Sequence, residues 1–268
     1  MFLKRLVSAI IFAFFVILVI QFGNIWGFFA IVSIFVILSI IEFSKLTKLV
    51  GSSYLWFINV PITWLICLST FKTNWIDTSF VLLMAVILLS VYEIIKSKPS
   101  SALLSISSAV FGIVYIGWLF GRHLILLRQM TDGKQIIFLL LGITWSGDIG
   151  AYIIGRSFGK HRVFPIISPN KSLEGFIAGI FFGILSTLVL CHLFSFNISL
   201  VHIIIMGTLL TIIGQIGDLV ESLLKRGAKV KDSGNLMPGH GGILDRCDSM
   251  ILITPALYYY LIYILHFN

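Results

Sequence analysis

Charged residues are scarce in this sequence: they make up 11% of its 268 residues, whereas hydrophobic residues make up 58%. A water-soluble domain carries about a quarter of charged residues, because water has to solvate its surface. The mean hydropathy of +1.05 points the same way. The deficit of charge excludes a soluble globular domain and predicts a chain that is solvated by lipid.

Cysteine is also scarce, with three residues, Cys67, Cys191 and Cys247, and no C-x-x-C spacing among them. This small number excludes a disulfide framework and a cysteine-ligated metal cluster. All three fall inside or at the edge of apolar stretches, so we expect them to be small buried apolar residues.

The sequence lacks the alternation of β-strands, and its apolar runs are far longer than the ~10 residues of a barrel strand. Backbone groups in hydrocarbon must then be satisfied within helices. The expected fold is an all-α, polytopic integral membrane protein with about nine transmembrane helices, at roughly 20 residues each, and a cytoplasm-facing polar cavity. We place the spans near residues 6–22, 25–42, 54–71, 76–95, 103–121, 135–155, 175–195, 199–218 and 247–266. The first is expected to be a retained helix, because no small-x-small cleavage site follows it.

Lysine and arginine are unevenly divided between the loops on the two sides of these spans. One side holds four of the nineteen, namely Lys72, Arg122, Arg128 and Lys134. The side of the N-terminus holds the other fifteen: Lys4, Arg5, Lys45, Lys48, Lys96, Lys98, Arg156, Lys160, Arg162, Lys171, Lys225, Arg226, Lys229, Lys231 and Arg246. Cytoplasmic loops carry the excess of basic residues, so the N-terminus and the polar residues 218–249 are predicted to be cytoplasmic. The net charge of +8 indicates attraction to the lipid bilayer. No nucleic acid partner is expected, because the basic residues are scattered among membrane loops.

We divide the chain into N-terminal transmembrane helices, residues 1–130, for packing and dimer contacts, and a C-terminal catalytic region, residues 131–268. The charges of the first region are expected at helix ends, where long side chains reach the headgroups. They include Glu42, Lys45, Lys48, Glu93, Lys96 and Lys98. In the second region Gly175, Gly179 and Gly183 form a stripe of small residues, which favours packing within the bundle over dimerisation.

A polar segment, residues 218–249, stands out in the second region. It holds five of the eleven acidic and five of the nineteen basic residues: Asp218, Glu221, Asp232, Asp245, Asp248, Lys225, Arg226, Lys229, Lys231 and Arg246. A helix continuing through Arg226 would place Asp218, Glu221 or Ser222, and Lys225 along one face. We expect that helix to break after Gly227.

Glycines at 239, 241 and 242 let the backbone approach a ligand closely, so that its N–H groups can cradle phosphate oxygens. The next helix then opens with Asp245 and Asp248, three residues apart on one face. Carboxylates beside a basic, glycine-rich loop are typical of a Mg²⁺–polyphosphate site. His240 could contact a phosphate or fix the loop.

An alternative interpretation treats the same charges as structural ion pairs at the membrane surface. It pairs Asp218 with Lys225, and Asp245 and Asp248 with Arg226 and Arg246. The glycines between them favour the functional interpretation.

Two further stretches carry polar groups. Asp148 falls inside an apolar span, where a carboxylate is destabilising unless it faces a cavity, a cation or a paired side chain such as Arg156. In the loop that follows, Ser172 is a plausible helix N-cap and Glu174 belongs to the first turn. Lys171 stands just before that helix, a combination that suits an anionic headgroup or phosphate.

The stretch S-L-L-K-R-G-A-K-V-K-D-S-G-N-L-M-P-G-H-G-G-I-L-D-R-C-D, residues 222–248, resembles the signature of the phosphatidate cytidylyltransferase (CDP-diacylglycerol synthase) family. D-I-G-A-Y-I-I-G-R-S-F-G-K and I-S-P-N-K-S-L-E-G also resemble family motifs, and the close resemblance covers residues 142–250. It implies transfer of CMP from CTP to phosphatidic acid in a bacterial inner membrane, by a homodimer that needs Mg²⁺. A monovalent ion such as K⁺ is a candidate for a second cation.

The resemblance implies that Asp218 and Asp245 hold the metal. Together with the residue chemistry it assigns the catalytic role to these two and to Lys225, Arg226 and Asp248. Substrate binding is assigned to Asp148, Lys171, Ser172, Glu174, Ser222, Lys231, Asp232, His240, Gly241, Gly242 and Arg246. The alternatives are a CTP-dependent lipid kinase, a CDP-archaeol-type synthase and, more remotely, an ion-coupled transporter.

Overall fold

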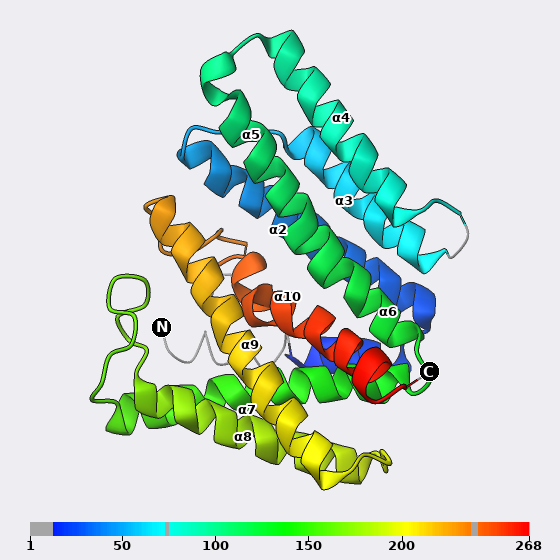
Figure 1. The fold of residues 1–268 in the computed structure, drawn as a ribbon, viewed down its shortest axis with the longest axis vertical. Helices are drawn as coiled ribbons and strands as arrows, with labels where there is room; N and C mark the ends of the chain where they lie inside the picture. The colour runs from blue at the N-terminus through cyan, green and yellow to red at the C-terminus, as the bar shows by residue number, and fades with distance from the viewer. Residues whose placement is uncertain (1–12, 73–74, 237–240, 268) are drawn as a thin grey trace. The chain divides into compact units, whose positions relative to one another are not determined.

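The computed structural model describes residues 13–72, 75–236 and 241–267, and within these ranges the protein is helical (Figure 1). No β-strand occurs among them; Arg162 and Ser172 form an isolated antiparallel bridge. The elements are α2 (Ile25–Leu49), α3 (Trp56–Phe71), α4 (Thr78–Lys96), α5 (Pro99–Gly112), η1 (Ile113–Arg122), α6 (His123–Gln129), α7 (Gly133–Phe158), α8 (Leu173–Leu193), α9 (Leu200–Gly227), α10 (Leu244–Tyr259) and η2 (Tyr260–Ile264). The predicted all-α fold is confirmed. His240 lies outside the described residues.

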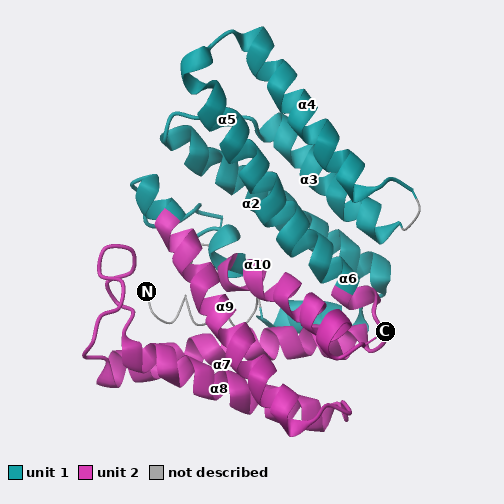
Figure 2. Cartoon of the chain, viewed as in Figure 1, with its two compact units in different colours: residues 1–126, 224–247 teal, residues 127–223, 248–268 magenta. Residues whose placement is uncertain are grey.

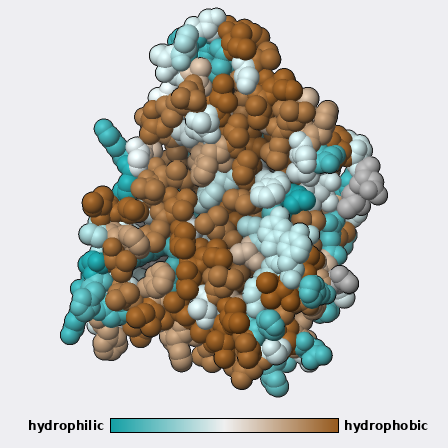
Figure 3. Space-filling view, in the orientation of Figure 1, coloured by the Kyte–Doolittle hydropathy of each residue, from teal (hydrophilic) through white to brown (hydrophobic). Residues whose placement is uncertain are grey.

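Seven helices in the described part of the chain are long and apolar enough to cross a membrane. Two shorter apolar helices, Ala13–Phe22 and Trp56–Phe71, occupy the other two positions where spans were predicted, so the count of nine stays a prediction. Large hydrophobic side chains are exposed on the helices, for example Leu103 at 83% and Ile95 at 76%. Hydrophobic residues cover much of the face in Figure 3. Because water would not solvate such a surface, the chain is a polytopic membrane protein.

The chain forms two compact units, which Figure 2 distinguishes by colour. The first contains residues 1–126 and 224–247. Its hydrophobic core is built from α3, α4 and the α5–η1 segment, with Ile66, Leu89 and Ile113 almost fully buried. Gly112 permits close packing there, because a Cβ atom on it would lie 2.5 Å from Phe43 Cδ1.

The second unit contains residues 127–223 and 248–268. Helices α7 and α8 pack along their length, and the predicted glycine stripe of α8 is buried within this unit. A Cβ on Gly175 would lie 2.7 Å from the carbonyl oxygen of Ala151, and one on Gly183 would lie 1.9 Å from Thr211 Oγ1. The stripe therefore serves packing inside the bundle, as predicted.

Several local predictions agree with the structure. Ser172 caps α8, since its Oγ accepts the N–H of Gly175 at 3.2 Å, and Glu174 lies in the first turn. Helix α9 ends at Gly227. The three cysteines are buried, and no disulfide joins them.

The expectation that all N-terminal charges reach the headgroups is wrong for two of them. Glu42 is 1% exposed and Glu93 is 3% exposed. Both carboxylates lie inside the first unit, where neighbouring helices cover them. Glu93 has Lys96 Nζ at 3.8 Å.

Candidate active site

The second unit contains a pocket of about 510 Å³ between α7, α8, α9 and the loop before α8. Its polar lining comes from Asp148, Arg156, Arg162, Asn170, Lys171, Ser172, Gln215 and Asp218. Its apolar lining includes Tyr152, Phe164 and Phe176. Three basic side chains and two carboxylates thus line the same pocket. The basic side chains suit anionic oxygens, and the carboxylates suit a bound cation.

Asp218 is a pocket carboxylate with both oxygens in contact with neighbouring side chains. Its Oδ2 lies 2.7 Å from Lys171 Nζ, and its Oδ1 accepts the hydroxyl of Ser222 at 3.3 Å. The two charged side chains are about one-third exposed, at 32% and 30%. The ammonium nitrogen of Lys171 is itself buried, so the exposed part of its side chain is the stem and not the charged group.

The loop before α8 is held by its own hydrogen bonds. Glu174 accepts the backbone N–H groups of Lys160 and His161 and lies 2.6 Å from His161 Nδ1. Arg162 donates to the carbonyl oxygen of Asn170 at 2.8 Å. Glu174 thus shapes the loop that carries Arg162 and Lys171, and its predicted contact with substrate stays a prediction.

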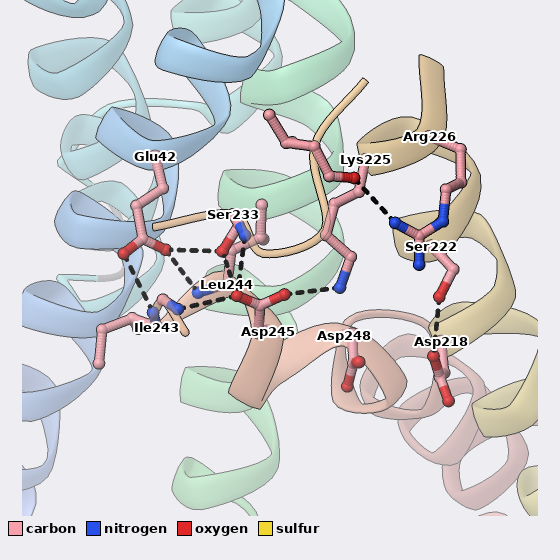
Figure 4. A network of polar contacts seen from close by, with 12 residues as sticks. Glu42, Asp218, Ser222, Lys225, Arg226, Ser233, Ile243, Leu244, Asp245 and Asp248 are labelled. Carbon is pink, nitrogen blue, oxygen red and sulfur yellow. Dashed lines mark hydrogen bonds and ion pairs between the residues drawn. The ribbon is translucent and has the colours of Figure 1, made fainter. Parts of the chain in front are cut away.

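A second group of site residues lies in the first unit, around Asp245 (Figure 4). Asp245 Oδ1 lies 2.6 Å from Lys225 Nζ. Oδ2 accepts the N–H of Ser233 at 2.9 Å, its hydroxyl at 2.8 Å and the N–H of Gly242 at 2.8 Å. The side chains of Asp245 and Lys225 are 6% and 11% exposed, so this is a buried ion pair in which both carboxylate oxygens accept hydrogen bonds.

Gly241 completes the turn before α10. It has a positive φ of 81°, and a Cβ there would lie 2.5 Å from Asp245 Oδ2. A side chain would be strained by the backbone and would displace the carboxylate. The glycine therefore serves the Asp245 contacts, and its predicted contact with phosphate stays a prediction.

Glu42 is the functional candidate that sequence reasoning missed. Its Oε1 accepts the N–H of Ile243 at 3.1 Å, and its Oε2 accepts the N–H of Leu244 at 2.9 Å (Figure 4). The signal was available, because an acidic residue inside an apolar helix is a functional candidate by default. That argument was applied to Asp148 and not to Glu42.

Asp218 and Asp245 each have a cationic partner that the structural alternative did not assign to them. Lys225 Nζ pairs with Asp245, and Asp218 pairs with Lys171. The sequence interpretation had grouped Asp218 and Lys225 by helix spacing alone. Contacts with distant elements decide both partners.

The remaining predicted residues lie nearer the surface. Arg226, Lys231, Asp232 and Arg246 are exposed, and Asp248 is half-buried. Arg226 donates to the carbonyl oxygen of Val230 at 2.9 Å, and Asp248 Oδ1 accepts the N–H of Ser249 at 2.7 Å. Their predicted contacts with substrate stay predictions.

Asp218 and Asp245, the two predicted metal ligands, differ in how readily they could bind a metal ion. Within the described ranges, no three His, Cys, Asp or Glu side chains form a ready cage. Mg²⁺ commonly needs only one or two carboxylates besides substrate phosphates and water. Asp218 fits that requirement, because its side chain is partly exposed and Asp148 lines the same pocket. Asp245 already accepts four hydrogen bonds, so it fits only if Lys225 moves away.

The fold defines an integral membrane protein, and its pocket is lined by basic and acidic side chains. The sequence profile of the cytidylyltransferase family matches residues 3–264. The phosphatidate cytidylyltransferase of Bacillus subtilis (strain 168) is 37% identical over 218 residues, which is 81% of this chain and 79% of that protein. Proteins of the same name from Staphylococcus saprophyticus and Staphylococcus aureus (strain COL) are 41% and 37% identical over 174 and 163 residues. Those matches cover 65% and 61% of this chain, and 65% and 62% of the two proteins, slightly under two thirds of each.

The chain belongs to the cytidylyltransferase family. It is therefore an enzyme of the nucleotidyltransferase class, and the family predicted from residues 142–250 is confirmed.

Proposed function

We propose that the chain is a phosphatidate cytidylyltransferase, which transfers CMP from CTP to phosphatidate and releases pyrophosphate. The product, CDP-diacylglycerol, is an intermediate of phospholipid biosynthesis. Relatives of that name at 37–41% identity support this assignment over the lipid kinase, the archaeol-type synthase and the transporter. The observation that carries it in the structure is the pocket in which Arg156, Arg162 and Lys171 accompany Asp148 and Asp218.

The reaction requires two anionic substrates to meet. An oxygen of the phosphatidate phosphomonoester attacks the α-phosphorus of CTP and forms a new P–O bond. The bond between that phosphorus and the oxygen bridging to the β-phosphate breaks, and pyrophosphate takes the electron pair. Because the phosphomonoester is already ionised near neutral pH, no strong general base is needed, and the site has to overcome charge repulsion.

The basic residues of the pocket meet that requirement. Lys171 and the guanidinium groups of Arg156 and Arg162 bind phosphate oxygens, Arg in the bidentate geometry that suits them. Lys225, Arg226, Lys231 and Arg246 are assigned to the triphosphate. The apolar lining, including Phe164 and Phe176, leaves the diacyl tails in contact with lipid while the headgroup enters.

A bound Mg²⁺ would neutralise charge on the triphosphate and on the leaving pyrophosphate. Asp218 is the residue whose surroundings fit that ion best. Asp245 is the second proposed ligand, and K⁺ is a candidate for a second cation. We also propose that the enzyme acts as a homodimer in the bacterial inner membrane, with the N-terminus and the site on the cytoplasmic side.

The test is an assay of detergent-purified protein with phosphatidate, Mg²⁺ and CTP labelled at either the α- or the γ-phosphate. We expect label from the α-position in the lipid product and label from the γ-position in pyrophosphate. Chelation with EDTA should stop the reaction, and added Mg²⁺ should restore it. Label from the γ-position in the lipid would identify a kinase instead, and no CTP turnover by folded protein would refute the proposal.

A further inference from the structure

Glu42 is a carboxylate inside an apolar stretch of α2, where it is 1% exposed. Removing a carboxylate from water is strongly destabilising unless hydrogen bonds or cations compensate. A residue of this kind therefore has a role that its neighbours in the structure should reveal.

The compensating groups come from a segment that lies about two hundred residues further along the chain. Glu42 Oε1 accepts the N–H of Ile243, and Oε2 accepts the N–H of Leu244 and the hydroxyl of Ser233 at 3.2 Å. The two N–H groups belong to the start of α10, where a helix leaves N–H groups unsatisfied and favours negative charge. Glu42 thus caps α10 from another helix (Figure 4).

Two glycines are fitted to this carboxylate. A Cβ on Gly242 would lie 2.3 Å from Glu42 Oε2, and a Cβ on Gly234 would lie 2.5 Å from Oε1. Both distances are too short for any real contact, so the segment can approach Glu42 only because these positions lack side chains. The hydrogen bonds and the close approach of the two glycines therefore both indicate a specific contact between Glu42 and this segment.

The segment that binds Glu42 also binds Asp245, because the hydroxyl of Ser233 contacts both carboxylates. The hydroxyl of Ser233 lies between the two carboxylates, 3.2 Å from Glu42 Oε2 and 2.8 Å from Asp245 Oδ2. Gly242, whose N–H binds Asp245, packs against Glu42. Any movement of Glu42 would therefore shift the groups that orient the Asp245–Lys225 pair.

We propose that Glu42 is a positioning residue for cytidylyl transfer: it anchors Ser233 and the Gly242–Leu244 turn, and through them holds Asp245 and Lys225 in place for the nucleotide phosphates. The inference rests on the proposed function. Glu42 itself touches no substrate and acts through the segment that it anchors.

The experiment compares Glu42→Gln with Glu93→Gln in full-length protein. Both substitutions replace a buried carboxylate of the first unit by an isosteric amide, but Glu93 lies beside Lys96 and not beside the anchored segment. In Glu42→Gln an amide N–H₂ group replaces a carboxylate oxygen that accepted hydrogen bonds from this segment, so two donors face each other. We expect its kcat/KM for CTP to fall by about 10- to 100-fold, the size expected for a lost hydrogen bond to a charged group.

The kinetic pattern separates positioning from a general loss of structure. With rates normalised to folded protein, Glu42→Gln should lower kcat and raise the KM for CTP, whereas the KM for phosphatidate stays within about threefold of the wild-type value. Glu93→Gln should retain the wild-type kinetics. Equal losses in both variants, or wild-type kinetics of folded Glu42→Gln, would overturn the proposal.

Hydrogen–deuterium exchange gives a readout that does not depend on the reaction. In Glu42→Gln the amides of Ile243 and Leu244 should exchange at least about tenfold faster than in wild type, and in Glu93→Gln they should not. If wild-type protein fails to transfer CMP while this difference is observed, the proposed function is wrong and the anchor stands. If transfer is normal in wild type and exchange is unchanged in Glu42→Gln, the anchor is wrong and the function stands.

Discussion

Replacing Asp245 by Asn removes one charge from the buried pair and leaves the size of the side chain almost unchanged. The amide oxygen of Asn can keep the three contacts that Oδ2 makes with Ser233 and Gly242. Its N–H₂ group then faces Lys225 Nζ, which lies 2.6 Å from Oδ1 in the wild-type protein. The substitution therefore isolates the effect of leaving the Lys225 ammonium without its carboxylate.

The expected magnitude follows from burial. The side chains of Asp245 and Lys225 are 6% and 11% exposed, so solvent screens their interaction little. Removing one partner of a buried ion pair costs about 3–5 kcal/mol, because the other charge stays buried without its counter-ion. We expect a decrease of this size in the free energy of unfolding of Asp245→Asn, measured by graded denaturation in detergent micelles. Cytidylyl transfer should be lost as well.

The double variant Asp245→Asn with Lys225→Met separates stability from activity. The second substitution also removes the buried ammonium that lost its carboxylate, and apolar replacements of buried pairs are often neutral or stabilising. Most of the lost stability should therefore return, but CMP transfer should not, because both groups are assigned to the nucleotide phosphates. Lys98→Gln, which removes an exposed lysine, is the control. A double variant as unstable as Asp245→Asn, or one that regains transfer, would refute the reasoning.

Three further predictions concern other parts of the chain. Asp218→Asn should lower the free energy of unfolding by about 1 kcal/mol, because its side chain is about one-third exposed and water can solvate part of it, yet lower CMP transfer by about 100-fold or more in the α-label assay. Gly242→Ala should destabilise the protein by about 1–3 kcal/mol through overpacking, whereas Gly227→Ala, whose Cβ would meet nothing within 4 Å, should cost nothing in the same denaturation assay. If the positive-inside assignment holds, Lys229→Cys should react with a membrane-impermeant maleimide only in permeabilised cells, and Lys72→Cys also in intact cells.

The controls for these predictions use features of the same chain. Because Cys67, Cys191 and Cys247 are buried, the parent protein should give little background labelling. Labelling in intact cells at the first engineered position and not at the second would reverse the assigned orientation. A large loss of stability in Asp218→Asn would show that its ion pair is structural, and full activity in that variant would remove it from the site.

Local signals in the sequence predicted most of the helices and their ends. The apolar runs gave segments that agree with α2, α4 and the later helices, because a membrane span is determined by the composition of about 20 consecutive residues. Ser172 and Gly227 were predicted correctly as a cap and an end for the same reason, since both depend on neighbours within one turn. Residues 142–250 were also sufficient to predict the family.

The partners of the charged groups could not be predicted in this way. Helix spacing put Asp218 with Lys225, yet the structure pairs Asp218 with Lys171 and Lys225 with Asp245. Spacing describes what lies on one face of a helix. It carries no information about which loop packs against that face.

The sequence by itself thus determined the membrane class, the helices and the polar segment, because hydropathy, caps and a family signature are properties of short stretches of chain. Only the tertiary structure decided that Glu42 caps α10 and that Ser233 lies between Glu42 and Asp245. The contacts of Glu42 join residues about two hundred positions apart. They depend on how the helices pack, and a buried carboxylate acquires its role from the donors that packing brings to it.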